Sequence, residues 1–118
     1  MVSDLEDLHV WAKALATGEL LSTAMQKERL EWVKVPGAEV IDAKYGLGIY
    51  SMGDLVGHDG MLWGYNSAMY YYPEEDSTIV VLFNRSMDQK DGQWVSPADP
   101  FSMGAAAILF PGKMPWDK

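Results

Sequence analysis

The stretch "GYNSAMYYYPEEDSTIVVLFN" (64–84) decides the fold, because it predicts two strands joined by a tight turn. Residues 64–72 are rich in tyrosine, which favours strands, and residues 77–84 include five consecutive apolar positions. The "PEED" sequence (73–76) between them is typical of a hairpin turn. A strand that is apolar on both faces needs a covering layer on each side, so we expect helices to pack against the sheet.

Two segments before this hairpin also have strand character. They read "YGLGIYSM" (45–52) and "DLVGHDG" (54–60), and the glycines of the first indicate that other backbone comes close. Together with the hairpin, they predict an antiparallel sheet of three to four strands.

The residues before the sheet predict two helices. Ser3 and Glu6 form a capping box, and Gly18 is a natural stop for the first helix. Ser22 is expected to cap a shorter second helix that ends near Leu30. The first helix carries one apolar stripe, formed by Leu5, Leu8, Trp11, Ala12 and Leu15.

A last helix is expected after the sheet. Asp99 and Pro100 read as a cap followed by a first-turn proline, and Pro111 with Gly112 ends the helix. Residues 87–99 before it are predicted to be a long loop. The order of helix, helix, antiparallel strands and helix is that of the α+β class, and 118 residues favour one domain.

Charge and composition exclude several classes of function. The chain has 17 acidic and 9 basic residues, for a net charge of −8, and its basic residues do not cluster. This argues against binding to nucleic acid or to an anionic membrane surface. The absence of cysteine excludes disulfides, thiolate metal sites and a cysteine nucleophile. No apolar run approaches the length of a membrane span.

Neither a metal site nor a cofactor is predicted. The two histidines are His9 and His58, and closed metal sites need three or four protein ligands. His9 lies beside the apolar stripe of the first helix and is expected at its surface or edge. The acidic run 74–76 lacks the spaced oxygen ligands of a calcium loop and is expected to be a solvated turn.

The residues alone leave the role of His58 open. It is either a hydrogen-bonded histidine at a strand end or a member of a catalytic site. None of the eight serines lies in a G-x-S-x-G elbow. A Ser-His-Asp triad is not excluded by this, because its members meet in space and not along the chain.

Four short motifs follow one another between residues 45 and 84. They are Y-G-L-G at 45–48, G-H-x-G at 57–60, G-Y-x-S at 64–67 and a valine-rich strand that ends at Asn84. In this order and spacing they resemble the C-terminal part of the serine β-lactamase and penicillin-binding-protein superfamily, in the branch of class C β-lactamases, DD-peptidases and related esterases. Residues 1–22 resemble a segment of the same family. The resemblance implies that residues 1–118 are one C-terminal fragment of a β-lactamase-like domain, with the sheet packed by N- and C-terminal helices.

The resemblance also assigns roles to single residues. In the family a helix supplies S-x-x-K with the serine nucleophile, a loop supplies Y-x-N or S-x-N, and a strand supplies K-T-G or H-x-G. His58, Asp59 and Gly60 would be this third element. His58 would be a hydrogen-bond donor or proton-relay group that faces the substrate, and Gly60 would let the substrate lie close to the strand. The backbone N–H of Met61 would be one half of the oxyanion hole.

Two of the three catalytic elements are absent from the 118 residues. No serine is followed three positions later by lysine, and no Tyr or Ser is followed two positions later by Asn. We therefore expect the C-terminal fragment of a longer serine hydrolase that forms an acyl-serine intermediate, with the fragment inactive alone. Asp59, which we expect to border the substrate, stands where many members have Thr. A carboxylate there sits poorly beside a substrate carboxylate, which favours a neutral ester or amide over a penicillin or D-Ala-D-Ala substrate.

Two other interpretations remain open. The chain is a stand-alone, non-catalytic module that binds a peptide or assembles with its own copies through an exposed sheet edge, or it is a complete small enzyme that uses His58 with an unrecognised serine. The partner implied by the resemblance is an acyl substrate, namely an ester, an amide or a β-lactam, bound by the full-length protein. The resemblance also favours a periplasmic or extracellular location, with any signal peptide upstream.

Overall fold

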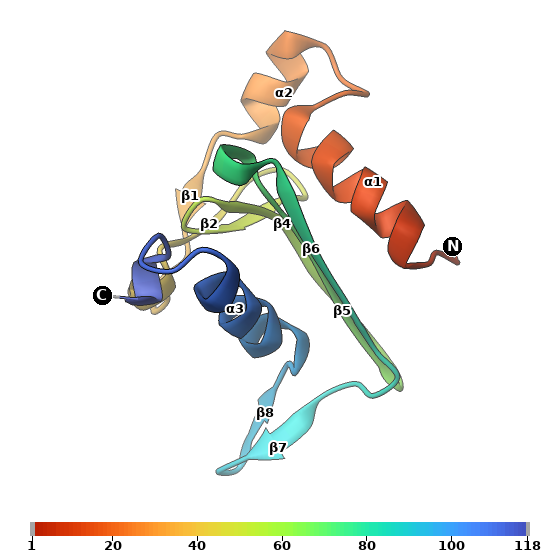
Figure 1. Ribbon diagram of the computed structural model, residues 1–118, viewed down its shortest axis with the longest axis vertical. Coiled ribbons are helices and arrows are strands. Elements are labelled where there is room, and N and C mark those ends of the chain that lie inside the picture. Colours follow the sequence, from red (N-terminus) through yellow and green to blue (C-terminus); the bar gives the residue numbers. More distant parts are fainter. Residues whose placement is uncertain (1, 118) are drawn as a thin grey trace.

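The structure is a computed structural model that describes residues 2–117, and Figure 1 shows its course. Its helices are α1 (Leu5–Thr17), α2 (Thr23–Arg29) and α3 (Ala98–Leu109). Its strands are β1 (Val33–Lys34), β2 (Ala43–Tyr45), β3 (Tyr50–Met52), β4 (Leu55–Leu62), β5 (Tyr65–Tyr72), β6 (Ser77–Phe83), β7 (Asp88–Lys90) and β8 (Gln93–Val95). Short 3-10 turns lie at Glu39–Ile41, Pro73–Glu75 and Pro115–Asp117.

The main sheet is antiparallel throughout, with the strands in the order β1-β2-β3-β4-β5-β6. This confirms the α+β class, although the sheet has six strands where three to four were expected. One additional strand is β1, and the other arises because the segment 45–52 bends into a hairpin with Tyr45 opposite Tyr50. The bend contains Gly48 at φ 64°, a conformation that glycine adopts without steric cost.

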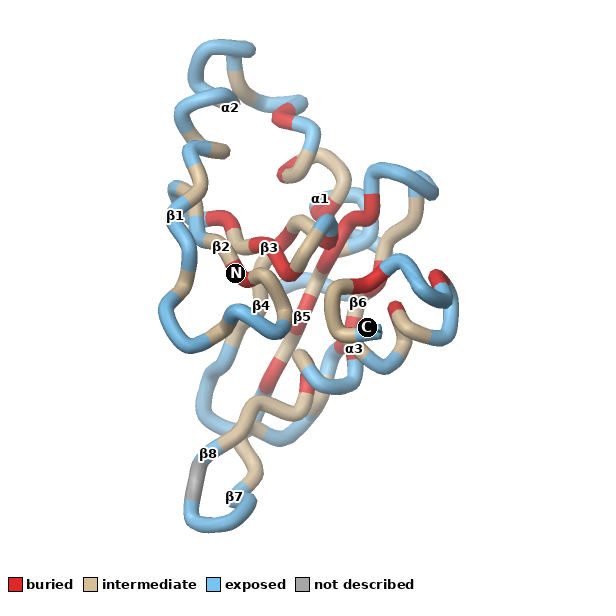
Figure 2. The backbone as a smooth tube through the Cα atoms, turned by 90° about the vertical axis from the view of Figure 1, so that its left-hand side faces the viewer, coloured by how far each residue is buried: buried red, intermediate tan, exposed pale blue. Residues whose placement is uncertain are grey.

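Helices cover the sheet on both sides, as the apolar character of β6 predicts. In Figure 1 the helices α1 and α3 lie on opposite faces of the strands β5 and β6. The face under α3 holds the larger cluster of buried side chains, and Figure 2 shows buried positions along β5. Its largest members are Tyr70 and Tyr72, which are 0% and 1% exposed. The tyrosine run is therefore part of the core.

The helix ends agree with the sequence in part. Gly18 ends α1 at φ 77°, and the Ser22 side chain accepts a hydrogen bond from the Met25 amide at the start of α2, as expected. The capping box at Ser3 is wrong by one residue. Asp4 caps α1 instead, because its Oδ1 accepts a hydrogen bond of 3.0 Å from the Asp7 amide.

The segment 87–99 is not the long loop that was expected. It contains the hairpin of β7 and β8, whose turn holds Asp91 and Gly92 at φ 51° and 79°. Positive φ at both positions is the signature of the tight turns that Asp-Gly favours in hairpins. The helix α3 then begins at Ala98, so Asp99 lies in its first turn and does not cap it.

The turn between β5 and β6 is anchored to elements on both faces of the sheet. Asp76 accepts hydrogen bonds from Lys13 of α1 and from Tyr71 of β5. Lys113, which follows α3, pairs with Glu74 and with its neighbour in the turn. The hydrogen bond from Lys13 chiefly lowers the pKa of Asp76, and the hydrogen bond from the Tyr72 hydroxyl, followed by that from Lys113, lowers the pKa of Glu74. Within residues 2–117, no helix combines the length and apolar character that crossing a membrane would require.

Candidate active-site wall

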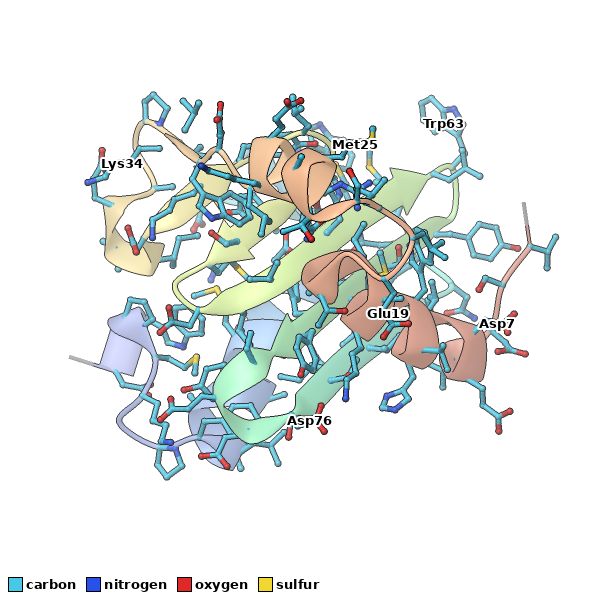
Figure 3. All side chains as sticks on the ribbon, turned by 90° about the horizontal axis from the view of Figure 1, so that it is seen from above. Asp7, Glu19, Met25, Lys34, Trp63 and Asp76 are labelled. Atoms are coloured by element: carbon cyan, nitrogen blue, oxygen red, sulfur yellow. The ribbon has the colours of Figure 1, made fainter. Side chains whose placement is uncertain are left out.

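The strand β4 is paired on both edges before His58 and on one edge from His58 onward. Its pairing with β3 runs only from Leu55 to Gly57, whereas its pairing with β5 continues to Leu62. From His58 to Leu62 the outer edge of β4 therefore has no strand beside it within residues 2–117. All four residues predicted for the site lie on this free edge, in consecutive positions. Figure 3 labels Trp63 at the end of the strand, where its side chain points away from the sheet.

His58 is held by two hydrogen bonds. Its Nε2 lies 2.7 Å from the hydroxyl oxygen of Tyr45, and its Nδ1 lies 2.5 Å from the backbone oxygen of Asp59. The Tyr45 ring also meets the imidazole edge-on, with ring centroids 5.5 Å apart and planes at 85°. About a third of the side chain is exposed, at 32%. The imidazole is thus oriented and still reachable from solvent.

Asp59 follows His58 in β4 and pairs in register with a residue on the α3 face of the sheet. Its Oδ1 is 3.4 Å from His58 Nδ1, and its register partner Ala68 belongs to the core on the α3 face. Asp99, in the first turn of α3, is close enough to respond to this charge. Burial chiefly, and then the Asp59 carboxylate, raise the pKa of Asp99. The role of Asp59 toward a substrate stays a prediction.

Asn66 connects the predicted site to α3. Its Nδ2 donates to the backbone oxygen of Gly60 at 3.0 Å, while its Oδ1 accepts from Ser96 Oγ at 3.0 Å and from the Ala98 amide at 2.8 Å. Only 2% of Asn66 is exposed. Sequence reasoning missed this residue. An asparagine near the start of a strand that is otherwise largely aromatic and apolar was the available signal, because polar groups are buried only with partners.

Gly60 and Met61 border open space. An open pocket of about 840 Å³ is lined by Gly60, Met61, Tyr65 and Phe83 among others. A second pocket of about 540 Å³ is lined by Met61, Leu62, Trp63, Ser86, Met87 and Trp94. A Cβ at Gly60 would come within 2.9 Å of Ser67 Oγ, so this part of the strand is closely packed on the β5 side. The oxyanion role of the Met61 amide stays a prediction.

Within residues 2–117, neither a serine partner nor a metal site accompanies His58. The hydrogen bonds that the structure shows for its imidazole involve Tyr45 and Asp59, and no serine. Ser67, the serine nearest Gly60, directs its Oγ to the Gly60 backbone oxygen at 3.5 Å. Within the described part of the chain, no three His, Asp or Glu side chains group together in a way that could hold a metal ion.

Comparison with known proteins assigns the family. The family model for Beta-lactamase matches residues 1–95, which is most of the chain. The chain belongs to the β-lactamase family. This confirms the resemblance drawn from the short motifs.

Among solved structures, a D-stereospecific amidohydrolase from a Streptomyces species has a similar fold. Its TM-score is 0.69 at 23% sequence identity, over 93% of this chain and 30% of the other. The chain thus spans about 30% of the length of this β-lactamase-like relative. At this identity the likeness concerns the fold alone. Curated protein sequences gave no match.

Proposed function

We propose that this chain is the C-terminal portion of a serine hydrolase related to β-lactamases, DD-peptidases and esterases, and that β4 forms the H-x-G wall of its active site. The observation that carries the proposal is the free edge of β4 from His58 to Leu62, beside an open pocket. An unpaired strand edge offers backbone donors and acceptors to an extended ligand. An acyl substrate would lie along this edge, close to the strand at Gly60.

The reaction would be acyl transfer through an acyl-serine intermediate. The Met61 amide would donate one hydrogen bond to the oxyanion that forms on the substrate carbonyl, and the amide of the nucleophile would donate the other. His58 would relay a proton between the reacting groups. The Asp59 carboxylate adds negative charge at this wall, which favours a neutral ester or amide over a substrate with a carboxylate.

The nucleophile would come from another part of a longer protein. Three observations support this. The 118 residues contain no S-x-x-K, and the amidohydrolase of similar fold is much longer than this chain. Ser51 and Ser102, two of the eight serines, are 2% and 0% exposed, which makes them poor candidates for attack on a substrate.

The test uses a covalent probe for serine hydrolases, either a fluorophosphonate or a labelled penicillin. The 118-residue chain alone is expected to remain unlabelled. The DNA upstream of Met1 is expected to encode S-x-x-K and Y-x-N in frame, and the longer product should react. In that product His58→Gln should slow acylation by about 10²–10⁴-fold, the usual contribution of a proton-transfer group. His9→Gln, the matched change at the other histidine, should leave the rate unchanged.

Two results would contradict the proposal. Covalent labelling of a serine within residues 1–118 would place the nucleophile in this chain. A stop codon in frame directly upstream of Met1 would remove the proposed source of S-x-x-K.

A second candidate function rests on the outer edge of β6. This seven-residue strand ends the sheet, and within residues 2–117 no strand pairs with its outer edge. Free strand edges pair with other chains. If the chain is a self-assembling module, light scattering will find a stable dimer or larger species, and a charge on the strand, as in Leu82→Lys, will dissociate it. A monodisperse monomer would contradict this second function.

A further inference from the structure

The hydrogen bonds of His58 admit one neutral form of its imidazole. The backbone oxygen of Asp59 can only accept, so His58 Nδ1, 2.5 Å away, must carry the hydrogen. A neutral imidazole then has a lone pair on Nε2. The hydroxyl of Tyr45, 2.7 Å from Nε2, must therefore donate to it.

We propose that Tyr45 belongs to this site, and that its hydroxyl fixes neutral His58 as the Nδ1–H tautomer and links the imidazole to the reacting group. The inference deepens the proposed function, on which it rests for its chemical meaning. Tyr45 reaches the imidazole from the end of β2, although β3 separates β2 from β4 in the sheet. Its ring contacts the imidazole edge-on and also lies 6.2 Å from the ring of Tyr50. The tyrosine is therefore oriented by packing as well as by its hydrogen bond.

The tautomer changes what His58 can do. Neutral His58 has its one hydrogen engaged with Asp59 and none on Nε2, so it cannot donate to a substrate. It accepts a proton through Tyr45, whose side chain is partly exposed. A proton from the reacting group would bind the tyrosine oxygen while the hydroxyl hydrogen moves to Nε2. One proton enters, and the products are an intact tyrosine and an imidazolium.

The surroundings suit the charged product. The Asp59 carboxylate lies 3.4 Å from Nδ1, and Asp99 is near enough for its pKa to respond to the charge of His58. The other ionisable groups near this point are the hydroxyls of Tyr45, Tyr50 and Tyr70, and that of Tyr70 donates to Asp99. Burial raises the pKa of Tyr50, so that side chain is neutral and adds no competing charge. An imidazolium at this position would thus face two carboxyl groups.

The test is ¹⁵N NMR of the two histidine side chains in the 118-residue protein, at a pH where both are neutral. His58 is expected to show hydrogen on Nδ1 and a free lone pair on Nε2. Tyr45→Phe removes only the hydroxyl, and the ratio of Nδ1–H to Nε2–H should fall by about fivefold or more, the effect of losing one neutral hydrogen bond. Tyr50→Phe is the matched control and should leave the ratio unchanged. His9 serves as the internal reference in every spectrum.

The result can overturn the inference in two ways. Wild-type His58 in the Nε2–H form would do so without any variant, so poor folding of a variant cannot hide the answer. An unchanged ratio in a folded Tyr45→Phe protein, judged by circular dichroism, would also do so. The outcome is independent of the probe experiment, because labelling of a serine in this chain would refute the proposed function and leave the tautomer as measured.

Discussion

Replacing Asn66 by alanine tests whether one buried side chain holds the predicted active-site wall to the rest of the fold. The substitution removes three hydrogen bonds, to Gly60, Ser96 and Ala98. Each is expected to contribute about 1 kcal/mol net, which gives a loss of about 3 kcal/mol in the free energy of unfolding. The Ala98 amide is buried and would be left without this acceptor, which places the expected loss at or above that sum.

A loss of this size is a large fraction of the stability of a small domain, which is typically about 5–15 kcal/mol. Urea unfolding followed by tryptophan fluorescence measures it, since the chain has five tryptophans. Asn84→Ala is the matched control, because Asn84 follows β6 and is exposed. It should change the free energy of unfolding by no more than about 0.5 kcal/mol.

A second measurement tests whether the loss of stability occurs where the Asn66 side chain is removed. Hydrogen exchange of the Ala98 amide should accelerate in Asn66→Ala, because this amide donates to the lost side chain. The reasoning would be refuted if Asn66→Ala cost less than about 1 kcal/mol, which is the worth of a single hydrogen bond. It would also be refuted if the cost did not exceed that of Asn84→Ala.

Three further substitutions have defined outcomes. Gly57→Ala should cost about 3 kcal/mol in urea unfolding, because its Cβ would lie 1.9 Å from the backbone oxygen of Met69, which cannot move aside. Gly60→Ala should cost about 1 kcal/mol or less, because the Ser67 hydroxyl that it meets can rotate, and the reverse ranking would contradict this account. Burial raises the pKa of Asp99 above 3.8, which means that the folded protein holds this proton more tightly than the unfolded chain does. The contribution of the Asp99 carboxyl group to the free energy of unfolding therefore falls as the pH rises through the folded-state pKa. Asp99→Asn should therefore raise the melting temperature at pH 7 but not below pH 3.8; an equal effect at both would refute this.

Most of the secondary structure follows from local patterns. The hairpin of β5 and β6 was predictable because its strands are apolar or aromatic and its turn is acidic, and Gly18 and Ser22 end and begin helices as their types favour. The hairpin of β7 and β8 was not predicted, although its Asp91-Gly92 turn was a visible signal. Its strands are only three residues long, too short to show a period.

Only those residues of the candidate site that are adjacent in the sequence could be proposed from the sequence. Residues 58–61 were singled out because they lie in or directly after one G-H-x-G motif, and their roles stay predictions. Tyr45 stood in a neighbouring motif, but nothing in the sequence pairs it with His58, thirteen residues away. Asn66 was missed, since its partner Ala98 lies 32 residues further along the chain.

The sequence by itself determined the α+β class, the apolar strand that requires helices on both faces, and the family to which the motifs belong. These features depend on residue type and spacing, because the periods of helices and strands relate spacing along the chain directly to secondary structure. The tertiary structure decided that the edge of β4 is free beyond Gly57, that Tyr45 meets His58, and that a buried asparagine secures the wall. The physical reason is that hydrogen-bond partners depend on strand register and on packing between distant segments, and periodicity carries no information about either.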